Sequence, residues 1–424
     1  MVILQKTNFY LNRIINKEES FTVILNRSLI NAKISSEEVL FIKDALKAVV
    51  NKYHFVRYEV VSASKEKELT FSLEELNVMI LCVAIFQYIK SISKEEVLNA
   101  LFKEFEEFDF THTYDEVRSV LDAIPDKPLE IPEKFNNIIS KKVALTYSYP
   151  EWIVKMMFKH FGVKETYRSV ASSRRAHPLV INYNSNEISP NELDSNMFVK
   201  THLTTTAYSY VGKDKIINLK EFKDNKVFVE DETSQLLIET LDPISGDDML
   251  FIDESNGLLP LDASLRCQDF CNIKVACKDN IQLQAVKNIA KKFKVSSIEA
   301  FVSDAKILIT HVEPRKMDKV VVIPSSSSLG SIRRHPDILL SLKREDLDGL
   351  IENQYYVLSE AERFVKDDGI LLYAVYTMNI KEGQNIVKKF LEEHTNYILL
   401  EERQIFPYEG PSDGVYYAKL KKNG

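Results

Sequence analysis

With 424 residues, the chain is too long for one compact core, because domains usually hold roughly 100–200 residues. Apolar residues make up 45% of the chain and charged residues 28%, and the sparse Gly and Pro exclude a largely disordered protein. The net charge of −7 argues against a protein that coats nucleic acid through bulk charge, although Lys and Arg can still cluster locally.

Residues 1–135 are predicted to form a helical domain. Three capping boxes mark helix starts, and each pairs a serine with a glutamate three residues later. These pairs are Ser35 with Glu38, Ser72 with Glu75, and Ser93 with Glu96. Residues 76–89 are apolar nearly all round, which places that helix at the centre of a bundle. Pro125, Pro128 and Pro132 indicate a linker at the end of this domain.

Residues 141–225 are predicted as a small mixed α/β domain, with a helix over 150–161 and strands near 179–183 and 203–210. From 226 to 424 strands and helices alternate. Strands are expected at 227–230, 249–253, 272–277, 320–323, 369–376 and 415–420, and helices at 233–241, 281–293, 344–365 and 381–394. This alternation predicts a mostly parallel, Rossmann-like sheet with its ligand site at the carboxyl ends of the strands.

A cytoplasmic protein without a membrane span is expected. The longest apolar run, residues 78–86, is about half of the ~18 residues needed to cross a bilayer. The first six residues lack the pattern of a secretory signal. The four cysteines show no paired zinc spacing, so a reducing compartment and no metal site are expected.

Five segments, in one order over about residues 145–424, resemble the RNA cytosine-5 methyltransferases of the Sun/Fmu/RsmB type. They are SYPEWIV (148–154), EDETSQ (230–235), LDPISG (241–246), IRRHPDI (332–338) and DGVYYAKL (413–420). The resemblance implies a class I methyltransferase domain, S-adenosylmethionine as cofactor, and ribosomal RNA of the small subunit as partner. The helical domain resembles, by its arrangement alone, the NusB-like domain that some members carry.

The two catalytic cysteines that the resemblance implies are replaced. One would attack C6 of cytosine and the other would help to release the product, but Tyr376 stands at the nucleophile position and Ser326 at the other. A phenol with a reference pKa of ~10 is a poor nucleophile, and a serine needs an activating base. No catalytic residue is therefore predicted.

The cofactor segment has also changed. Of its implied glycines Gly257 remains, and the acid expected to hold the ribose hydroxyls falls at Lys278, or at Asp279 after a one-residue slip. Asp304 still matches the acid near the adenine. We therefore expect no tight cofactor binding.

Basic residues gather in two places that favour phosphate contact. They are Lys155, Lys159, Arg168, Arg174 and Arg175 in the stretch that ends at His177, and Arg333, Arg334 and His335 beside the former active-site loop. Trp152 and Phe158 are better explained as core residues. The lysines of the helix over 281–293 are better explained as a solvated face, and residues 325–328 as a flexible loop.

Taken together, these features favour an RNA-binding pseudo-enzyme that acts on or with the small ribosomal subunit, as an assembly or ribosome-associated factor. Two alternatives stay open. The first is an active S-adenosylmethionine-dependent RNA (cytosine-5) methyltransferase with atypical motifs. The second is a protein-interaction scaffold, or a regulatory partner of an active paralogue, which the net acidity also suits.

Overall fold

The computed structural model describes residues 2–176, 179–253 and 256–424. His177 and residues 254–255 of the cofactor segment lie outside the described residues. The chain forms two compact units. The first, called the helical unit, is Met1–Arg174 with Arg334–Leu342, and the second, the sheet unit, is Arg175–Arg333 with Lys343–Gly424. Each unit is described by itself.

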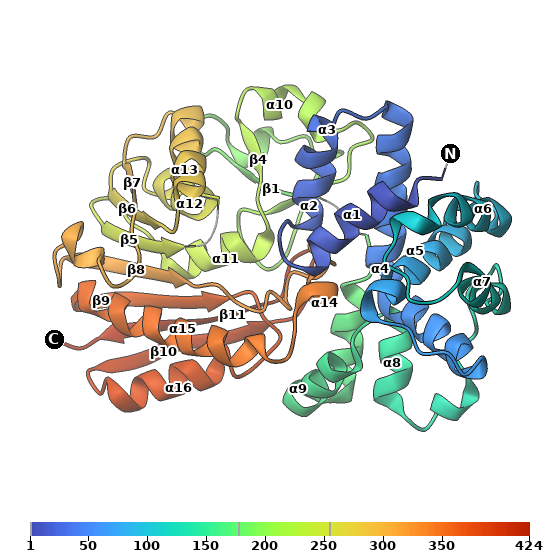
Figure 1. Cartoon of the computed structure of the whole chain (residues 1–424). Coiled ribbons are helices and arrows are strands. Elements are labelled where there is room, and N and C mark those ends of the chain that lie inside the picture. Colours follow the sequence, from blue (N-terminus) through green and yellow to red (C-terminus); the bar gives the residue numbers. More distant parts are fainter. Residues whose placement is uncertain (1, 177–178, 254–255) are drawn as a thin grey trace. The chain divides into compact units, whose positions relative to one another are not determined.

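The helical unit is built from helices whose starts are fixed by local caps (Figure 1). Its helices are α1 (Leu4–Ile15), α2 (Phe21–Val23), α3 (Leu29–Asn31), α4 (Ser36–Glu66), α5 (Leu73–Tyr88), α6 (Lys94–Glu104), α7 (Tyr114–Ala123), α8 (Ile139–Tyr147), α9 (Glu151–Ser172) and α14 (Ile338–Ser341). All three predicted capping boxes are present, at the starts of α4, α5 and α6. A fourth box, which was not predicted, pairs Thr113 with Glu116 at the start of α7.

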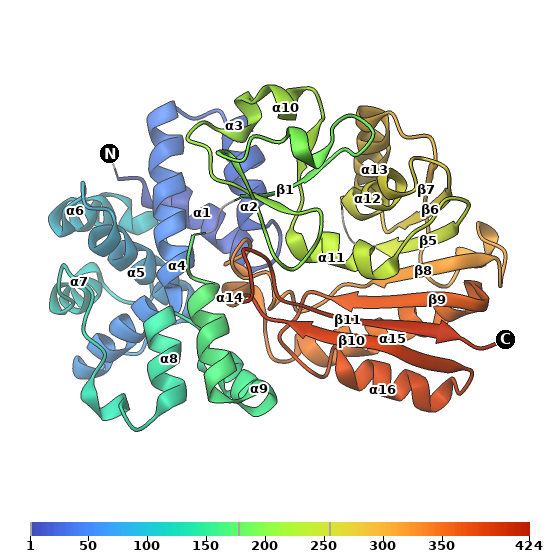
Figure 2. The ribbon, with the colours of Figure 1, turned by 180° about the vertical axis from the view of Figure 1, so that it is seen from behind.

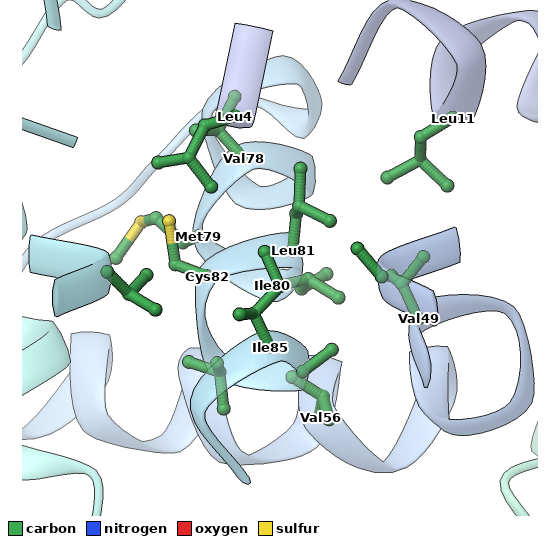
Figure 3. Packing of buried hydrophobic residues seen from close by; sticks show 14 of the residues in the cluster. Leu4, Leu11, Val49, Val56, Val78, Met79, Ile80, Leu81, Cys82 and Ile85 are labelled. Atoms are coloured by element: carbon green, nitrogen blue, oxygen red, sulfur yellow. The ribbon is translucent and has the colours of Figure 1, made fainter. Parts of the chain in front are cut away.

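Helix α5 lies at the centre of this unit, as predicted. Its residues from Val78 to Phe86 are all buried and pack against apolar side chains of α1, α4, α6 and α7. Figure 3 shows Val78, Leu81 and Ile85 of α5 among Leu4, Val49 and Val56. Full burial of an aliphatic side chain contributes about 1.5–3 kcal/mol, so this one helix supplies much of the unit's stability.

Helices α8 and α9 belong to the helical unit, not to the small mixed domain predicted for residues 141–225. The reason is packing, because α8 contacts α4 as well as α9. Arg174, which follows α9, also links this helix to the end of α8, because it donates hydrogen bonds to the carbonyl oxygens of Tyr147, at 2.9 Å, and Ser148, at 2.8 Å. The predicted boundary near residue 141 therefore falls inside a compact unit.

The IRRHPDI segment is also anchored in the helical unit. The Asp337 carboxylate accepts the backbone N–H of Phe21, at the first turn of α2, at 3.0 Å. The imidazole of His54 donates from Nε2 to the carbonyl oxygen of Leu339 at 2.7 Å. Burial lowers the pKa of His54 to about 4, so the ring is neutral at pH 7 and this N–H is retained.

The sheet unit holds two sheets (Figures 1 and 2). The smaller is antiparallel, in the order β2 (Phe198–Lys200), β3 (Tyr208–Tyr210), β1 (Leu179–Tyr183), β4 (Val227–Val229). The larger has seven strands in the order β10 (Tyr397–Ile405), β11 (Val415–Lys422), β9 (Val365–Val375), β8 (Met317–Ile323), β5 (Asp248–Asp253), β6 (Asn272–Cys277), β7 (Ile298–Val302). Strands β5 to β9 are parallel, and β11 is antiparallel to both β9 and β10.

Helices cover both faces of the seven-stranded sheet, because its central strands are apolar on both sides. One core lies under α11 (Glu232–Leu241), α12 (Leu258–Arg266) and α13 (Asn280–Phe293). The other lies under α15 (Asp346–Ala361) and α16 (Gln384–Glu393). The short helix α10 (Lys220–Lys223) contacts β4. These layers confirm the predicted Rossmann-like fold, which a helical domain accompanies.

Within the described residues, no helix is both long and apolar enough to cross a membrane.

The anchor at Asp337 can be tested directly. Replacing Asp337→Ala leaves the N–H of Phe21 without its acceptor, which costs about 1–3 kcal/mol locally. Amide hydrogen exchange over residues 334–342 should then rise by roughly ten- to a hundredfold. The exposed Asp126→Ala serves as control. Unchanged protection of 334–342 in the Asp337 variant would show that the carboxylate does not hold the segment.

Candidate functional site

The candidate site lies at the carboxyl ends of β5, β8 and β9, where loops 324–331 and 376–383 follow β8 and β9. This is the edge at which open α/β sheets bind their ligands. The loops carry both former cysteine positions, Ser326 after β8 and Tyr376 directly after β9.

A buried carboxylate joins the two loops. Glu382 is fully buried and accepts the backbone N–H of Ser327 at 2.7 Å and its hydroxyl at 2.6 Å. It also accepts the hydroxyl of Thr377 at 2.6 Å. The side-chain amides of Gln354 and Asn379 donate to it at 3.0 and 3.2 Å. Five donors thus replace the water that a buried carboxylate loses. This network was not predicted from sequence.

The loops also touch through their backbones. The N–H of Gly330 donates to the carbonyl of Tyr376 at 3.2 Å, and the N–H of Gly414 donates to the carbonyl of Gly330 at 2.9 Å. A Cβ at Gly330 would lie 1.9 Å from the carbonyl oxygen of Gly414, so only glycine fits. Residues 325–328, predicted as a flexible loop, are instead tied to the loop after β9 through Ser327 and Glu382.

Neither former cysteine position carries an activated nucleophile. The phenol oxygen of Tyr376 is hydrogen-bonded to the hydroxyl of Ser234, on α11, at 2.7 Å. Its half-buried ring packs against the core beneath α11. The hydroxyl of Ser326 accepts the backbone N–H of Ser328 at 3.2 Å. A serine needs a neighbouring base to take its proton, and no described residue is hydrogen-bonded to the Ser326 hydroxyl in that role.

A cavity of about 210 Å³ opens at the ends of β5, β6, β7 and β8. Its lining includes Lys278, Asp304, Pro324 and Tyr356. The resemblance implies S-adenosylmethionine at this edge of the sheet, yet pockets for small molecules and cofactors usually exceed about 300 Å³.

The described residues around this cavity fit the cofactor poorly. The exposed Lys278 stands where an acid is expected, and the Asp279 carboxylate instead caps α13 by accepting the N–H of Gln282 at 2.8 Å. The Asp304 carboxylate accepts two backbone N–H groups of its own turn, from Lys306 and Ile307. The retained Gly257 has φ +91°, and a Cβ at this position would lie 3.0 Å from the Cα of Val286 on α13, so backbone conformation and helix packing explain the glycine.

A pair of buried acids joins the small sheet to α12. Glu230 accepts the side-chain N–H of Asn182 at 2.8 Å, and Asp262 accepts that of Arg266 at 3.2 Å. Burial raises the pKa of Glu230 well above its usual value, and the nearby Asp262 raises it further. Burial also raises the pKa of Asp262, which Arg266 partly offsets.

The predicted RNA-contacting residues fall into two groups. Lys155, Lys159, Arg168, Arg175 and Arg334 are exposed. Their ion pairs are loose or surface pairs, such as Lys155 with Glu151 at 3.0 Å and Arg168 with Glu165 at 3.6 Å, which contribute little. Gly162, with φ +78°, interrupts α9 between Lys159 and Arg168.

The second group is engaged within the protein. The Arg174 guanidinium caps α8, as described, and lies over the ring of Tyr149 at 5.2 Å. Arg333 donates to the carbonyl oxygens of Ser412, at 2.7 Å, and Pro407, at 2.5 Å. The side chain of His335 is half-buried. The sequence does not reveal which arginines will donate hydrogen bonds to backbone carbonyl groups, because those groups come from other segments of the chain.

The four cysteines are free thiols, and all of them are buried. Among the residues that the structure describes, no His, Cys, Asp and Glu cluster could hold a metal ion.

The Glu382 network predicts a large loss of stability. Replacing Glu382→Ala removes the shared acceptor of several buried donors, so the free energy of unfolding should fall by at least about 3 kcal/mol. Urea unfolding measures this loss, and the exposed Glu352→Ala on α15 is the control. A loss under about 1 kcal/mol would mean that the donors find other acceptors.

The raised pKa of Glu230 predicts a pH-dependent stability. Folding raises the pKa of Glu230 above its ordinary value of 4.5. The contribution of the protonated Glu230 side chain to the free energy of unfolding is therefore complete below pH 4.5, and it is lost as the pH rises through the pKa in the folded state. Replacing Glu230→Gln keeps the side chain neutral, so stability should decline less between pH 5 and pH 9 than in the wild type. Urea midpoints across this range test it, with Glu352→Gln as control. Parallel curves for wild type and Glu230→Gln would refute it.

The comparisons with known proteins agree with this fold. The family model described as 16S rRNA methyltransferase RsmB/F matches residues 267–421. The chain is 24% identical over 307 residues to the probable ribosomal RNA small subunit methyltransferase B of Bacillus subtilis (strain 168), covering 67% of this chain and 68% of that protein.

Two solved structures share the architecture. The crystal structure of PH0851 aligns with a TM-score of 0.74 and 17% identity, over 100% of this chain and 99% of that chain. A methyltransferase homolog protein from Pyrococcus horikoshii aligns with a TM-score of 0.59 and 16% identity, over 67% of this chain and 98% of that chain. At such identities these structures show the fold alone. With the family match and the curated relatives, the chain belongs to the RsmB/F-type methyltransferase family, also called the Sun/Fmu family.

Proposed function

We propose that this protein is an RNA-binding pseudo-enzyme, which acts with the small ribosomal subunit as an assembly or ribosome-associated factor. The observation that carries the proposal is the state of Tyr376. A hydrogen-bonded phenol stands at the implied nucleophile position, and its partner Ser234 holds it at 2.7 Å. The thiol chemistry of the family has no group to perform it at either former cysteine position.

The cofactor cavity supports the loss of methyl transfer. Its lining offers Lys278 in place of the ribose-binding acid, and the nearby carboxylates of Asp279 and Asp304 accept backbone N–H groups. We therefore expect no tight binding of S-adenosylmethionine.

RNA binding is supported by how charge is distributed along the helical unit and the two residues that follow Arg174. Residues 136–176 carry eight Lys and Arg against two Glu, whereas residues 1–135 carry 17 Lys and Arg against 22 Asp and Glu. The exposed members of the basic group are on or next to α9, at Lys155, Lys159, Arg168 and Arg175. Flexible cations at this density suit contact with phosphates. The curated relative, a small-subunit rRNA methyltransferase by name, makes ribosomal RNA in the cytoplasm the partner we propose.

Ultraviolet crosslinking of the tagged protein in its native cells, followed by sequencing of the attached RNA, tests the proposal. Crosslinks should form a sharp cluster in small-subunit ribosomal RNA. Replacing Lys155, Lys159, Arg168 and Arg175 together by Ala should reduce them by about tenfold or more, because each lost phosphate contact weakens binding. The matched control replaces Lys287, Lys291, Lys292 and Lys294, all exposed on α13 or at its end, by Ala.

Two outcomes would contradict the proposal. Crosslinks no more frequent than those of an unrelated cytosolic protein would remove RNA as the partner and favour the scaffold alternative. Methyl transfer from S-adenosylmethionine to RNA by the purified protein would favour the active-enzyme alternative instead.

A further inference from the structure

The helical unit contains a second feature, which the proposed function does not use. A groove of about 560 Å³ lies along α1, beside the start of α5 and the residues that follow α6. We call it the α1 groove. Its lining includes Phe9, Phe108 and Phe110 as apolar residues and Asn8, Glu74 and Asp109 as polar residues.

The apolar part of the α1 groove is unusually accessible for aromatic side chains. Phe9 is 58% exposed, although the rest of α1 buries Leu4, Leu11 and Ile14 in the core. Phe110 stacks on Phe105 with ring centroids 4.8 Å apart, which keeps it in place at the groove. An exposed aromatic patch beside a concave surface is a typical site for an apolar side chain of a partner.

The polar part of the groove is acidic and unneutralised. Glu74 and Asp109 are exposed, and neither makes a hydrogen bond or ion pair within the described residues. Glu107, also in the lining, accepts the side-chain N–H of Gln5 and keeps its charge. The one lysine of the lining, Lys6, is paired with Glu38 at 2.7 Å. The Arg13 guanidinium lies 5.7 Å from the centre of the Phe9 ring, but it pairs with neither Glu74 nor Asp109 within the described residues. Carboxylates that lack a paired cation and lie near aromatic rings suit a lysine or arginine.

We propose that the α1 groove binds a short basic segment of a protein partner, in which Lys or Arg side chains alternate with an apolar anchor. Charge complementarity decides between this occupant and RNA. Residues 1–135 have a net charge of −5, and RNA phosphates are repelled by Glu74, Glu107 and Asp109. The basic group of α9 and the acidic α1 groove thus belong to the same unit but suit opposite partners.

Fluorescence anisotropy with defined peptides tests this site on the full chain. The probes are fluorescein-labelled octapeptides of alternating Arg and Leu, of alternating Arg and Ser, and of alternating Glu and Leu. The Arg–Leu peptide should bind with a Kd on the order of 10–100 µM, which corresponds to a weak but specific contact. The Arg–Ser peptide should bind at least about fivefold more weakly for lack of an apolar anchor, and the Glu–Leu peptide should not bind.

Matched variants separate the groove from bulk charge. Glu74→Gln with Asp109→Asn should weaken binding of the Arg–Leu peptide about tenfold, whereas Glu352→Gln with Asp367→Asn, exposed acids of the sheet unit, should leave it unchanged. Phe9→Ala should also weaken it, and Phe102→Ala, which is 65% exposed outside the groove, should not.

Equal losses in both acid pairs would reduce the effect to net charge and overturn the proposal. Binding of a uridine dodecamer that depends on Glu74, Asp109 or Phe9 would overturn it in favour of RNA. The peptide measurement contains no ribosomal RNA, so it succeeds or fails independently of the crosslinking experiment.

Discussion

The arrangement of the candidate site depends on one buried carboxylate. Glu382 has no cation beside it among the described residues and relies on donors from three directions: the loop after β8, the loop after β9, and α15. A charge in such a place is tolerated only while every donor stays in position, because each lost hydrogen bond exposes it to an apolar surrounding. The loops after β8 and β9 are therefore tied to one another through Glu382. In the pseudo-enzyme that we propose, this tie preserves the shape of the loops without a part in any chemistry.

Much of the fold follows from local patterns, and so it could be predicted from the sequence. The start of each capped helix depends on residues three apart, and strand β6 has the bounds predicted for it because it is apolar and short. Strand β10 was missed because residues 398–403, three apolar residues followed by three charged ones, do not alternate between apolar and polar. They are exposed at the edge of the sheet, where pairing with β11 holds the strand. The Glu382 network was missed for a different reason. Ser327, Gln354 and Thr377 are far apart in the chain, and no periodicity connects them.

Which basic residues are exposed could not be predicted from the sequence either. Arg174 and Arg333 are indistinguishable in the sequence from their neighbours Arg175 and Arg334, yet two are engaged with backbone carbonyls and two are exposed. Charge counts, by contrast, need no knowledge of contacts. The opposite signs of residues 1–135 and 136–176 were available from the sequence, whereas the groove along α1, which gives part of the acidic surface a shape that a partner could recognise, was not.

The anchoring of residues 334–342 in the helical unit has a consequence for how the chain is made. The hydrogen bond between Phe21 and Asp337 joins residues 316 positions apart. A ribosome that has finished the first 174 residues has therefore not yet supplied all of the helical unit, and the N–H of Phe21 and the His54 ring wait for partners from a later segment. Closing so long a loop is slow compared with forming local helices. The first domain to emerge is thus among the last to be completed, and until then its surface beside α1 and α4 stays open to chaperones and to water.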